Sequence, residues 1–552
     1  MTPPRAGPAR SGRAGVTRAA FTAPADRRSL LDRAHRGDIV GALGRIPSQE
    51  TGPRRSLRGH AAALLAVMGP GVVVLAADND AGGISTYAQA GQDYGLRFVW
   101  LLLVLAGVLL VNQEMVGRLG AVTGAGHARL IYERFGRRWG AFALGDLLVV
   151  NFLIIVTEFT GVSFALGYFG VSRYLSVPLA ALTLIALPAT GSFRRWERAV
   201  YVLVAASLVA VPLAILAHHP GPLPALPAAR RAPPEGAALV VIAMVGTTVA
   251  PWQLFFHQSS VVDKRITPRW LGYERADTVI GTLLFALGAV AVLTACALAF
   301  SATSWHGAFL DAGTVAAALG HRGGWAGALF AVALVNGSVL GAGAVTLSAS
   351  YAIGDVTGTR HSLHRPWRDA RVFHGSYATL VALAAAVVLI PGAPLGLVTT
   401  GVQALAGVLL PSALVFLLLL CNDRAVLGPW VNPRWLNIIA GSITVIFLAL
   451  SALLVTGTLF PHLTTSWRIA ALVLLAAGIL GAALGARLSP DGLPGPPGSS
   501  RSGPPAWTMP PIETLPPPPA SRARTLGLIA LRAYLLLAAA VVIIKVIQLI
   551  TG

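Results

Sequence analysis

Long stretches of this 552-residue chain contain no charged residue, a pattern that few soluble folds can accommodate. These stretches cover residues 200–216, 278–301, 376–391 and 411–420, each within a longer apolar run. A helix that spans a bilayer needs about 20 mostly apolar residues. Only 12% of all residues are charged, whereas soluble domains have about 25%. We therefore predict an all-α polytopic membrane protein, and an ordinary soluble protein is excluded.

The apolar runs divide the chain into thirteen predicted helices. They lie at residues 61–92, 96–117, 139–168, 174–192, 196–217, 236–262, 274–301, 323–353, 372–391, 397–421, 433–458, 467–487 and 525–550. Residues 1–59 are rich in Arg, Ala, Pro and Gly and are predicted to be a disordered arm. A solvated tail is favoured there over a short amphipathic helix at residues 29–43. The remaining regions are a ten-helix core at 60–421, two accessory transmembrane helices at 433–487, a Pro/Gly-rich linker at 488–523 and a last transmembrane helix at 524–552.

The basic residues predict the orientation in the membrane. With the N-terminus in the cytoplasm, the cytoplasmic loops of the core carry 18 Lys and Arg residues and the outer loops carry six. This bias follows the positive-inside rule and argues against nucleic-acid binding as the source of the net charge of +20. Forty of the 42 basic residues are Arg, which with many Ala and Gly residues is typical of a GC-rich bacterial genome. We expect a multi-pass protein of the bacterial inner (cell) membrane.

Two of the predicted helices contain residues that interrupt a helix. The first helix contains Asp-Asn-Asp-Ala-Gly-Gly at 78–83, and the sixth contains Gly-Thr-Thr-Val-Ala-Pro at 246–251. Glycine is permissive in its backbone angles, and proline removes a backbone donor. Interrupted helices in matching positions of two five-helix halves are typical of inverted-repeat transporters, whose binding site lies at the breaks. The sequence therefore predicts a substrate site between residues 78–83 and 246–251.

The side chains at the breaks indicate the kind of substrate. Asp78 and Asp80 are carboxylates at membrane depth, where a charge is costly and rarely lacks a function. One or both could instead cap a half-helix or pair with Arg. The other candidate ligands offer oxygen, which suits hard ions such as Mg²⁺, Ca²⁺ and Mn²⁺. They are Thr247, Thr248, the carbonyl of Ala250, Gln253 and, on the tenth helix, Gln403.

Four motifs resemble the NRAMP family of divalent-metal transporters. They are Gly-Pro-Gly at 69–71 followed by Asp-Ala-Gly-Gly at 80–83 and Gln-Ala-Gly at 89–91, then Leu-Gly-Ala-Val-Thr-Gly at 119–124, the run 246–259, and residues 403–432. The resemblance covers about residues 60–458. It implies a LeuT-type inverted repeat of helices 1–5 and 6–10, with a metal ion bound between broken helices one and six and carried inward with protons.

The chain departs from the family pattern at three positions of the binding motifs. Gly83 stands where the family has its asparagine ligand, and Ala250 stands where it has its methionine ligand. Thr247 replaces an alanine of the helix-six motif. The loss of the methionine sulfur is expected to relax discrimination against hard ions. The pattern is most similar to the NRAMP-related magnesium transporter branch, so Mg²⁺ is the first predicted substrate and Mn²⁺ the second.

The residues that the resemblance implies for proton movement are also changed. Trp252 stands in place of the family's helix-six histidine, whereas His257 aligns with a second family histidine. On helix three, Asn151 and Gly161 replace two family acids and Glu158 keeps the third. A proton relay needs contiguous titratable groups. We therefore expect weak or absent proton coupling, with Glu158, His257, Trp252 and Asn151 lining a proton path or cavity.

Other functions remain open from the sequence alone. The first alternative is an ordinary proton-coupled Mn²⁺ or Fe²⁺ transporter of the family. A carrier of an organic cation or amino acid and a non-transporting membrane sensor are further alternatives. No nucleophile–base pair or phosphate-binding loop indicates an enzyme. We expect no cofactor, a divalent metal ion as the transported substrate, contact with the lipid bilayer and no nucleic-acid partner, and the sequence leaves the oligomeric state undetermined.

Overall fold

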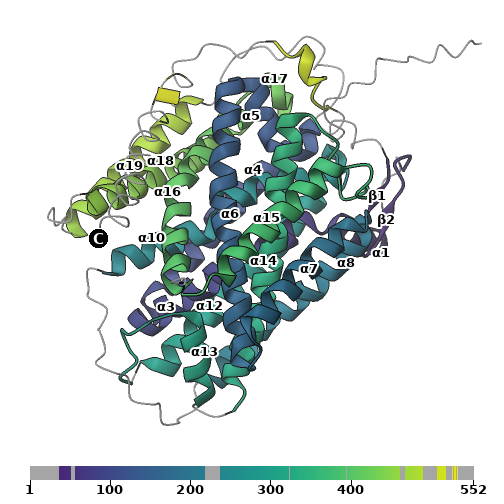
Figure 1. Ribbon diagram of the computed structural model, residues 1–552. Helices are drawn as coiled ribbons and strands as arrows, with labels where there is room; N and C mark the ends of the chain where they lie inside the picture. Colours follow the sequence, from purple (N-terminus) through teal and green to yellow (C-terminus); the bar gives the residue numbers. More distant parts are fainter. Residues whose placement is uncertain are drawn as a thin grey trace, which may run out of the picture.

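The computed structural model describes residues 37–50, 56–217, 236–301, 303–321, 324–392, 395–459, 467–488 and 507–516, with residues 525, 528, 529 and 531. The described part is a bundle of long helices (Figure 1). The helices are α1 (Leu57–Val67), α2 (Pro70–Ala76), α3 (Ala81–Tyr94), α4 (Val99–Thr123), α5 (His127–Phe135), α6 (Arg137–Tyr168), α7 (Arg173–Ala189), α8 (Phe193–Ala206), α9 (Ala210–Leu216), α10 (Gly236–Thr248), α11 (Pro251–Asp263), α12 (Leu271–Phe300), α13 (Ala312–His321), α14 (Ala326–Thr357), α15 (Arg371–Leu389), α16 (Leu395–Cys421), α17 (Arg424–Leu427), α18 (Arg434–Leu459) and α19 (Trp467–Leu488).

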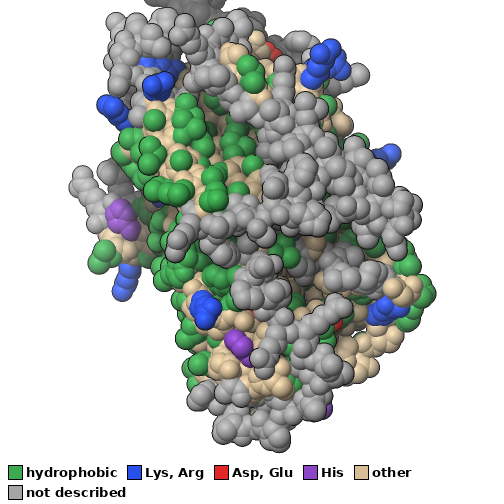
Figure 2. All heavy atoms as spheres, turned by 90° about the vertical axis from the view of Figure 1, so that its left-hand side faces the viewer, with side chains coloured by type: hydrophobic (Ala, Val, Ile, Leu, Met, Phe, Trp, Pro, Cys, Tyr) green, Lys and Arg blue, Asp and Glu red, His purple; other side chains and the backbone are tan. Residues whose placement is uncertain are grey.

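The helices agree with a membrane-spanning bundle. Within the described ranges, nine helices are long and apolar enough to cross a membrane, or ten if the bent pair α1–α2 is counted as one span. Apolar side chains cover an extended patch of the described surface, and Lys and Arg side chains lie around it (Figure 2). The predicted linker lies outside the described residues except for residues 507–516. The predicted last helix at 525–550 lies outside them except for four residues.

The N-terminal part of the first predicted helix is divided further than the sequence suggested. Helices α1 and α2 meet at an angle of 55°. Gly69 at this bend has a φ of 151°, a value that favours glycine, and Pro70 opens α2. The segment between the predicted helices at 274–301 and 323–353 also contains a helix, α13.

A short β-hairpin precedes α1. Strands β1 (Ile39–Val40) and β2 (Arg45–Ile46) pair antiparallel, with Ile39 opposite Ile46. Both isoleucines are buried and form a small apolar cluster with Ala63, Ala66 and Val67 of α1. The prediction of a disordered arm over 1–59 is therefore wrong for residues 37–50, because the two isoleucines can bury their side chains against α1. The predicted alternative helix at 29–43 is likewise replaced by strand at 39 and 40, and residues 29–36 lie outside the described residues.

Part of the predicted flexible linker lies against the bundle. The Met509 amide donates to the Val122 carbonyl at 3.1 Å, and the Arg134 guanidinium donates to the Pro516 carbonyl at 2.7 Å. The Trp507 ring lies against Gly428. Residues 507–516 therefore follow the end of α4 instead of extending freely, because their backbone finds partners on helices of the core.

Four long helices, α4, α12, α14 and α16, pack around the two breaks. The chain leaves α2 at Ala76 and re-enters a helix at Ala81, and it leaves α10 at Thr248 and re-enters at Pro251. Helix α3 packs on α10 and α12, and α11 packs on α4 and α14. Helix α16 packs on both α10 and α3. The backbone freed at each break is therefore enclosed by protein, as backbone at membrane depth must be.

One close helix contact gives a prediction about stability. A Cβ atom on Gly91 of α3 would lie 2.2 Å from the Leu293 carbonyl of α12, whereas a Cβ on Gly107 of α4 meets no described atom within 4 Å. Gly91→Ala is expected to destabilise the protein by about 1–3 kcal/mol because α3 and α12 must separate. Gly107→Ala, the matched control, should be neutral or slightly stabilising because alanine favours a helix. Thermal unfolding of both variants in detergent measures this difference, and equal melting temperatures would contradict the close packing.

Candidate metal site

The break in the first helix is organised by Asp80. Its carboxylate caps α3 by accepting the Gly83 amide proton at 2.7 Å. Glu158 of α6 accepts the Ala81 amide proton at 3.1 Å, and its carboxyl group lies beside Asp80, since a Cβ on Gly341 would meet both side chains within 3.0 Å. Both acids are buried. The predicted capping role of Asp80 is therefore present, and it places two acidic side chains side by side at the start of α3.

Asp78 lies at the same break and faces the sixth helix. It is fully buried, and the Gln253 side-chain amide donates to its Oδ1 atom. Its Oδ2 atom has no hydrogen-bond partner among the described residues. A buried carboxylate oxygen without a partner is costly unless a cation or another ligand satisfies it. Asp78 therefore presents an available anionic oxygen at the break.

The break in the sixth helix supplies further oxygen atoms. Ala250 has an extended backbone, with φ −102° and ψ 147°. Its carbonyl accepts the backbone amide proton of Gln253 at 3.2 Å. The Thr248 hydroxyl lies 3.0 Å from the Tyr87 hydroxyl of α3. The Thr247 hydroxyl is buried and lacks a hydrogen-bond partner within the described ranges. Threonine and carbonyl oxygens thus lie at the break in the sixth helix, which the Gln253 side chain joins to Asp78.

Helix α16 closes the site from a third direction. Gln403 is buried, and its Nε2 atom would lie only 1.7 Å from a Cβ built on Gly82. The backbone carbonyl of Gln403 also lies close to Gly246 of α10, where a Cβ would be 2.3 Å away. The absence of side chains at Gly82 and Gly246 therefore allows α16 to approach both broken helices.

The structure brings together most of the predicted ligands. Asp78, Asp80, Gly83 and Gln253 are linked by direct contacts, and Gln403 contacts the neighbouring Gly82. The donors are carboxylate, hydroxyl, carbonyl and amide groups. No group of three or more His, Cys, Asp and Glu side chains occurs in the part of the chain that the structure describes. The donor chemistry at the breaks suits a hard divalent ion and lacks the sulfur and imidazole that softer metals prefer.

The residues predicted to line a proton path do not lie together. Glu158 contacts Asp80, but Asn151 donates to the Val345 carbonyl of α14 at 3.1 Å and thereby links two helices. Trp252 is buried, with its ring centroid 6.3 Å from that of Phe256. His257 lies in a separate polar cluster with Gln113 and Glu274.

Sequence reasoning missed the role of Glu274. This acid is at the start of α12 and fully buried, 3.0 Å from the His257 ring. Gln113 of α4 connects His257 to Gln253. The signal in the sequence was weak, because an acid near a helix end is usually a solvated residue.

Comparison with known proteins decides the family. Residues 71–457 match the model of the Nramp, or natural resistance-associated macrophage protein-like, family. The chain belongs to the Nramp family. It is 28% identical over 448 residues to the divalent metal cation transporter MntH of Burkholderia ambifaria, covering 77% of this chain and 95% of that protein. It is 30% identical over 398 residues to MntH 1 of Pseudomonas aeruginosa, covering 68% and 88%.

A solved structure of a manganese transporter confirms the fold. The manganese transporter of Eremococcus coleocola, in complex with an aromatic bis-isothiourea compound, is 19% identical and aligns with a TM-score of 0.57. The alignment covers 79% of this chain and 98% of that chain. The predicted all-α polytopic fold with a LeuT-type inverted repeat is therefore confirmed. This Nramp protein is a multi-pass membrane protein of a divalent-metal transporter family.

Proposed function

We propose that this Nramp protein imports Mn²⁺ across the bacterial cell membrane by alternating access. The observation that carries the proposal is the meeting of two buried carboxylates, Asp78 and Asp80, at the break between α2 and α3 and directly opposite the break between α10 and α11. Relatives with similar chains are named divalent metal cation transporters. The positive-inside bias supports a cytoplasmic N-terminus, and a membrane potential that is negative inside would drive a divalent cation inward.

The ion would be held by oxygen atoms from both breaks. Asp80 and Asp78 would supply the negative charge, and the Thr247 hydroxyl and the Ala250 carbonyl at the break in the sixth helix would supply neutral oxygen atoms. Gln403 closes the site from α16, and Gln253 can offer its amide oxygen if its side chain turns. At Gly83 no side chain reaches the ion. A Cβ there would lie 2.7 Å from the Asp78 carbonyl, so the close approach of the two backbone segments requires glycine.

Mg²⁺ is a second candidate substrate, favoured by one observation. The ligand atoms at the breaks are all oxygen, because Ala250 and Gly83 stand at the positions where the family resemblance implies methionine and asparagine. Mg²⁺ binds oxygen ligands and keeps several of its waters. The relatives' names favour Mn²⁺ as the first candidate, and the same oxygen set suits both ions.

A flux assay in proteoliposomes tests the proposal. The purified full-length chain is reconstituted, and Mn²⁺ and Mg²⁺ uptake are followed with ion-sensitive dyes inside the vesicles. We expect saturable Mn²⁺ uptake that Mg²⁺ inhibits and that small amines do not. Inhibition by amines instead of Mg²⁺ would favour the organic-cation carrier, and vesicles without any metal flux would overturn the proposal.

Restoring a sulfur ligand should change the selectivity. Ala250→Met is expected to raise the ratio of Cd²⁺ to Mg²⁺ uptake by about tenfold or more, because thioether sulfur prefers softer ions. Ala250→Leu is the matched control, since leucine has a similar volume but no sulfur. Competition of Cd²⁺ and Mg²⁺ against Mn²⁺ uptake measures the ratio. The same shift in both variants would indicate that side-chain size, and not sulfur, sets the selectivity.

The sequence predicts weak proton coupling, because Glu158 and His257 are the only residues of the family's proton relay that this chain keeps. The geometry supports a different view of these two residues. Glu158 lies in contact with Asp80, where a proton on either acid would compete with the metal. His257 has acquired an acidic partner, Glu274, that the family resemblance did not imply. We therefore assign proton dependence of the proposed transport cycle to Glu158, which lies beside Asp80.

A further inference from the structure

Seven arginines gather where the start of α8 meets the segment before α15. Three lie in the first two turns of α8, and four lie in residues 358–371. These seven residues, the arginine patch, are Arg194, Arg195, Arg198, Arg360, Arg365, Arg368 and Arg371. The two segments touch, because the rings of Phe193 and His364 stack with their centroids 4.9 Å apart. A Cβ on Gly191 would also lie only 2.5 Å from the backbone nitrogen of Pro366.

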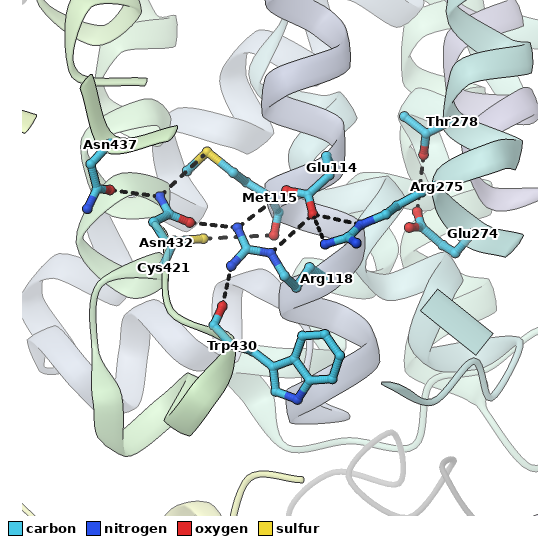
Figure 3. A network of polar contacts seen from close by, with 10 residues as sticks. All are labelled: Glu114, Met115, Arg118, Glu274, Arg275, Thr278, Cys421, Trp430, Asn432 and Asn437. Atoms are coloured by element: carbon cyan, nitrogen blue, oxygen red, sulfur yellow. Dashed lines mark hydrogen bonds and ion pairs between the residues drawn. The ribbon is translucent and has the colours of Figure 1, made fainter. Parts of the chain in front are cut away.

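The arginine patch differs from the other basic residues at the predicted cytoplasmic side of the core. Six of its arginines are exposed and Arg365 is half-buried. Within the described ranges, no guanidinium group of the patch has a hydrogen bond or an ion pair. Elsewhere on this side most basic groups have partners, as Arg118 and Arg275 do in binding Glu114 (Figure 3). Partners are also present for Arg129, Arg134, Lys264, Arg265 and Arg269.

Little negative charge lies beside the arginine patch. The two segments contain two acids, and one of them, Glu197, is buried in an ion pair with Lys264. The other acid, Asp369, is exposed. The positive-inside rule accounts for basic residues on this side of the membrane, but it does not require them to gather without partners on two touching segments. The patch is therefore suited to an anion that comes from outside the protein.

The surroundings of the arginine patch are typical of a bilayer surface. Trp367 is 39% exposed, and its ring stacks on His374 with 5.6 Å between centroids. Tryptophan is enriched where a bilayer meets water. Helix α7 packs on α15, and both present apolar side chains outward, with Leu182 66% and Leu383 54% exposed. A ligand with a charged part and a hydrocarbon part can therefore contact the arginines and this apolar surface together.

We propose that the arginine patch binds the phosphate group of an anionic phospholipid, such as phosphatidylglycerol, in the cytoplasmic leaflet. Clusters of about four to eight basic residues at a membrane surface recognise anionic lipids. Guanidinium groups suit this ligand because they bind two phosphate oxygens at once. Trp367 and the apolar surface of α7 and α15 favour a lipid over a soluble anionic partner. The proposal does not depend on which metal ion the protein carries.

A lipid at the arginine patch would connect two segments that both hold the end of α11. Asp263, the last residue of α11, accepts the Leu363 amide proton at 2.9 Å. Lys264, the next residue, pairs with Glu197 of α8. A phosphate group bound by arginines of both segments would restrain them against the same helix end. Because a ligand that binds only the folded state raises its stability, bound lipid should stabilise the protein.

Thermal unfolding of the full chain in neutral detergent, with added lipid, tests the proposal. We expect phosphatidylglycerol to raise the melting temperature by about 2–4 °C, whereas phosphatidylcholine, which has no net charge, should not. High salt should reduce the rise, because it screens exposed charges. Hydrogen–deuterium exchange of wild type locates the lipid, and phosphatidylglycerol should protect residues 358–371 more than residues 127–138. Equal effects of the two lipids, or equal protection of the two segments, would overturn the proposal.

A fourfold variant removes the exposed charge at the centre of the patch. It combines Arg194→Gln, Arg195→Gln, Arg368→Gln and Arg371→Gln. These side chains are exposed and lack partners among the described residues, so the melting temperature without lipid should stay at the wild-type value. We expect phosphatidylglycerol to bind about tenfold more weakly or worse, because each basic group near an anionic surface contributes to the affinity. Native mass spectrometry with increasing lipid measures this change, and lysine at the same four positions should keep most of the binding.

The matched control removes the same charge elsewhere on the predicted cytoplasmic side. It combines four substitutions of exposed arginines, Arg58→Gln, Arg137→Gln, Arg138→Gln and Arg434→Gln. This variant should bind phosphatidylglycerol like wild type and keep the rise in melting temperature. Equal losses in the two fourfold variants would replace the proposed site with a general attraction between the protein and anionic lipid. Inorganic phosphate that stabilised wild type as much as phosphatidylglycerol would overturn the lipid as the ligand.

Discussion

Asp80→Asn is expected to reduce Mn²⁺ uptake by about 100-fold or more while the protein remains folded. Asparagine caps a helix about as well as aspartate, so the start of α3 keeps its hydrogen bond from Gly83. The negative charge is lost, and a hydrogen bond or contact to a charged group contributes about 1.5–3 kcal/mol. Each tenfold change in affinity corresponds to about 1.4 kcal/mol, so the loss of about 3 kcal/mol corresponds to a factor of about 100. The charge of Asp80, and not its capping role, would then account for the lost uptake.

The measurement is initial Mn²⁺ uptake into proteoliposomes, together with the elution profile and melting temperature of the same preparation. Asp93→Asn is the control, because Asp93 is on the same helix but accepts the Phe309 amide proton at 3.0 Å, away from the breaks. This control should transport like wild type. Asp80→Ala should lose uptake and also melt earlier, since it removes the cap, which contributes about 1 kcal/mol. Normal uptake by Asp80→Asn would exclude Asp80 as the main metal ligand.

The breaks could be predicted from the sequence because their cause is local. Two adjacent glycines after Asp80, and Pro251 after a Gly-Thr-Thr run, lower the cost of leaving a helix wherever they occur. Matching positions in two halves of the chain then locate the site without a structure. Asp80 and Gln403 could be predicted as site residues from their positions at the break and on the tenth helix. In the structure, Asp80 contacts Gly83 and Gln403 contacts Gly82.

The polar cluster of Gln113, His257 and Glu274 could not be predicted, because it forms only where the three helices α4, α11 and α12 meet. Gln113 lies 144 residues before His257 in the sequence. Each of the three residues also has an ordinary alternative role on its own helix. The hairpin at residues 39–46 was missed for a related reason. Its burial depends on the face of α1 that it covers, and the Arg-rich composition around it dominated the local prediction.

The bend between α1 and α2 depends on a buried ion pair. Lys264 is 1% exposed, and its ammonium group contacts a Glu197 carboxylate oxygen and the Met68 carbonyl. The other Glu197 oxygen accepts the Ala42 amide proton from the hairpin. Tyr201 donates to the same Met68 carbonyl at 2.6 Å. One ion pair therefore joins α8, the loop after α11, the bend and the N-terminal hairpin.

Lys264→Met is expected to destabilise the protein by about 3–5 kcal/mol, because it leaves the Glu197 carboxylate buried without its cation. This loss should lower the melting temperature by about 10 °C. The double variant Lys264→Met with Glu197→Gln should recover much of it, since no uncompensated charge remains and both replacements keep the side-chain volume. Arg45→Met is the control at an exposed ion pair, with Arg45 71% exposed beside Asp38, and should change the melting temperature little. If the single and double variants melted at the same reduced temperature, the lost contact with Met68, and not the unpaired charge, would be the source of the instability.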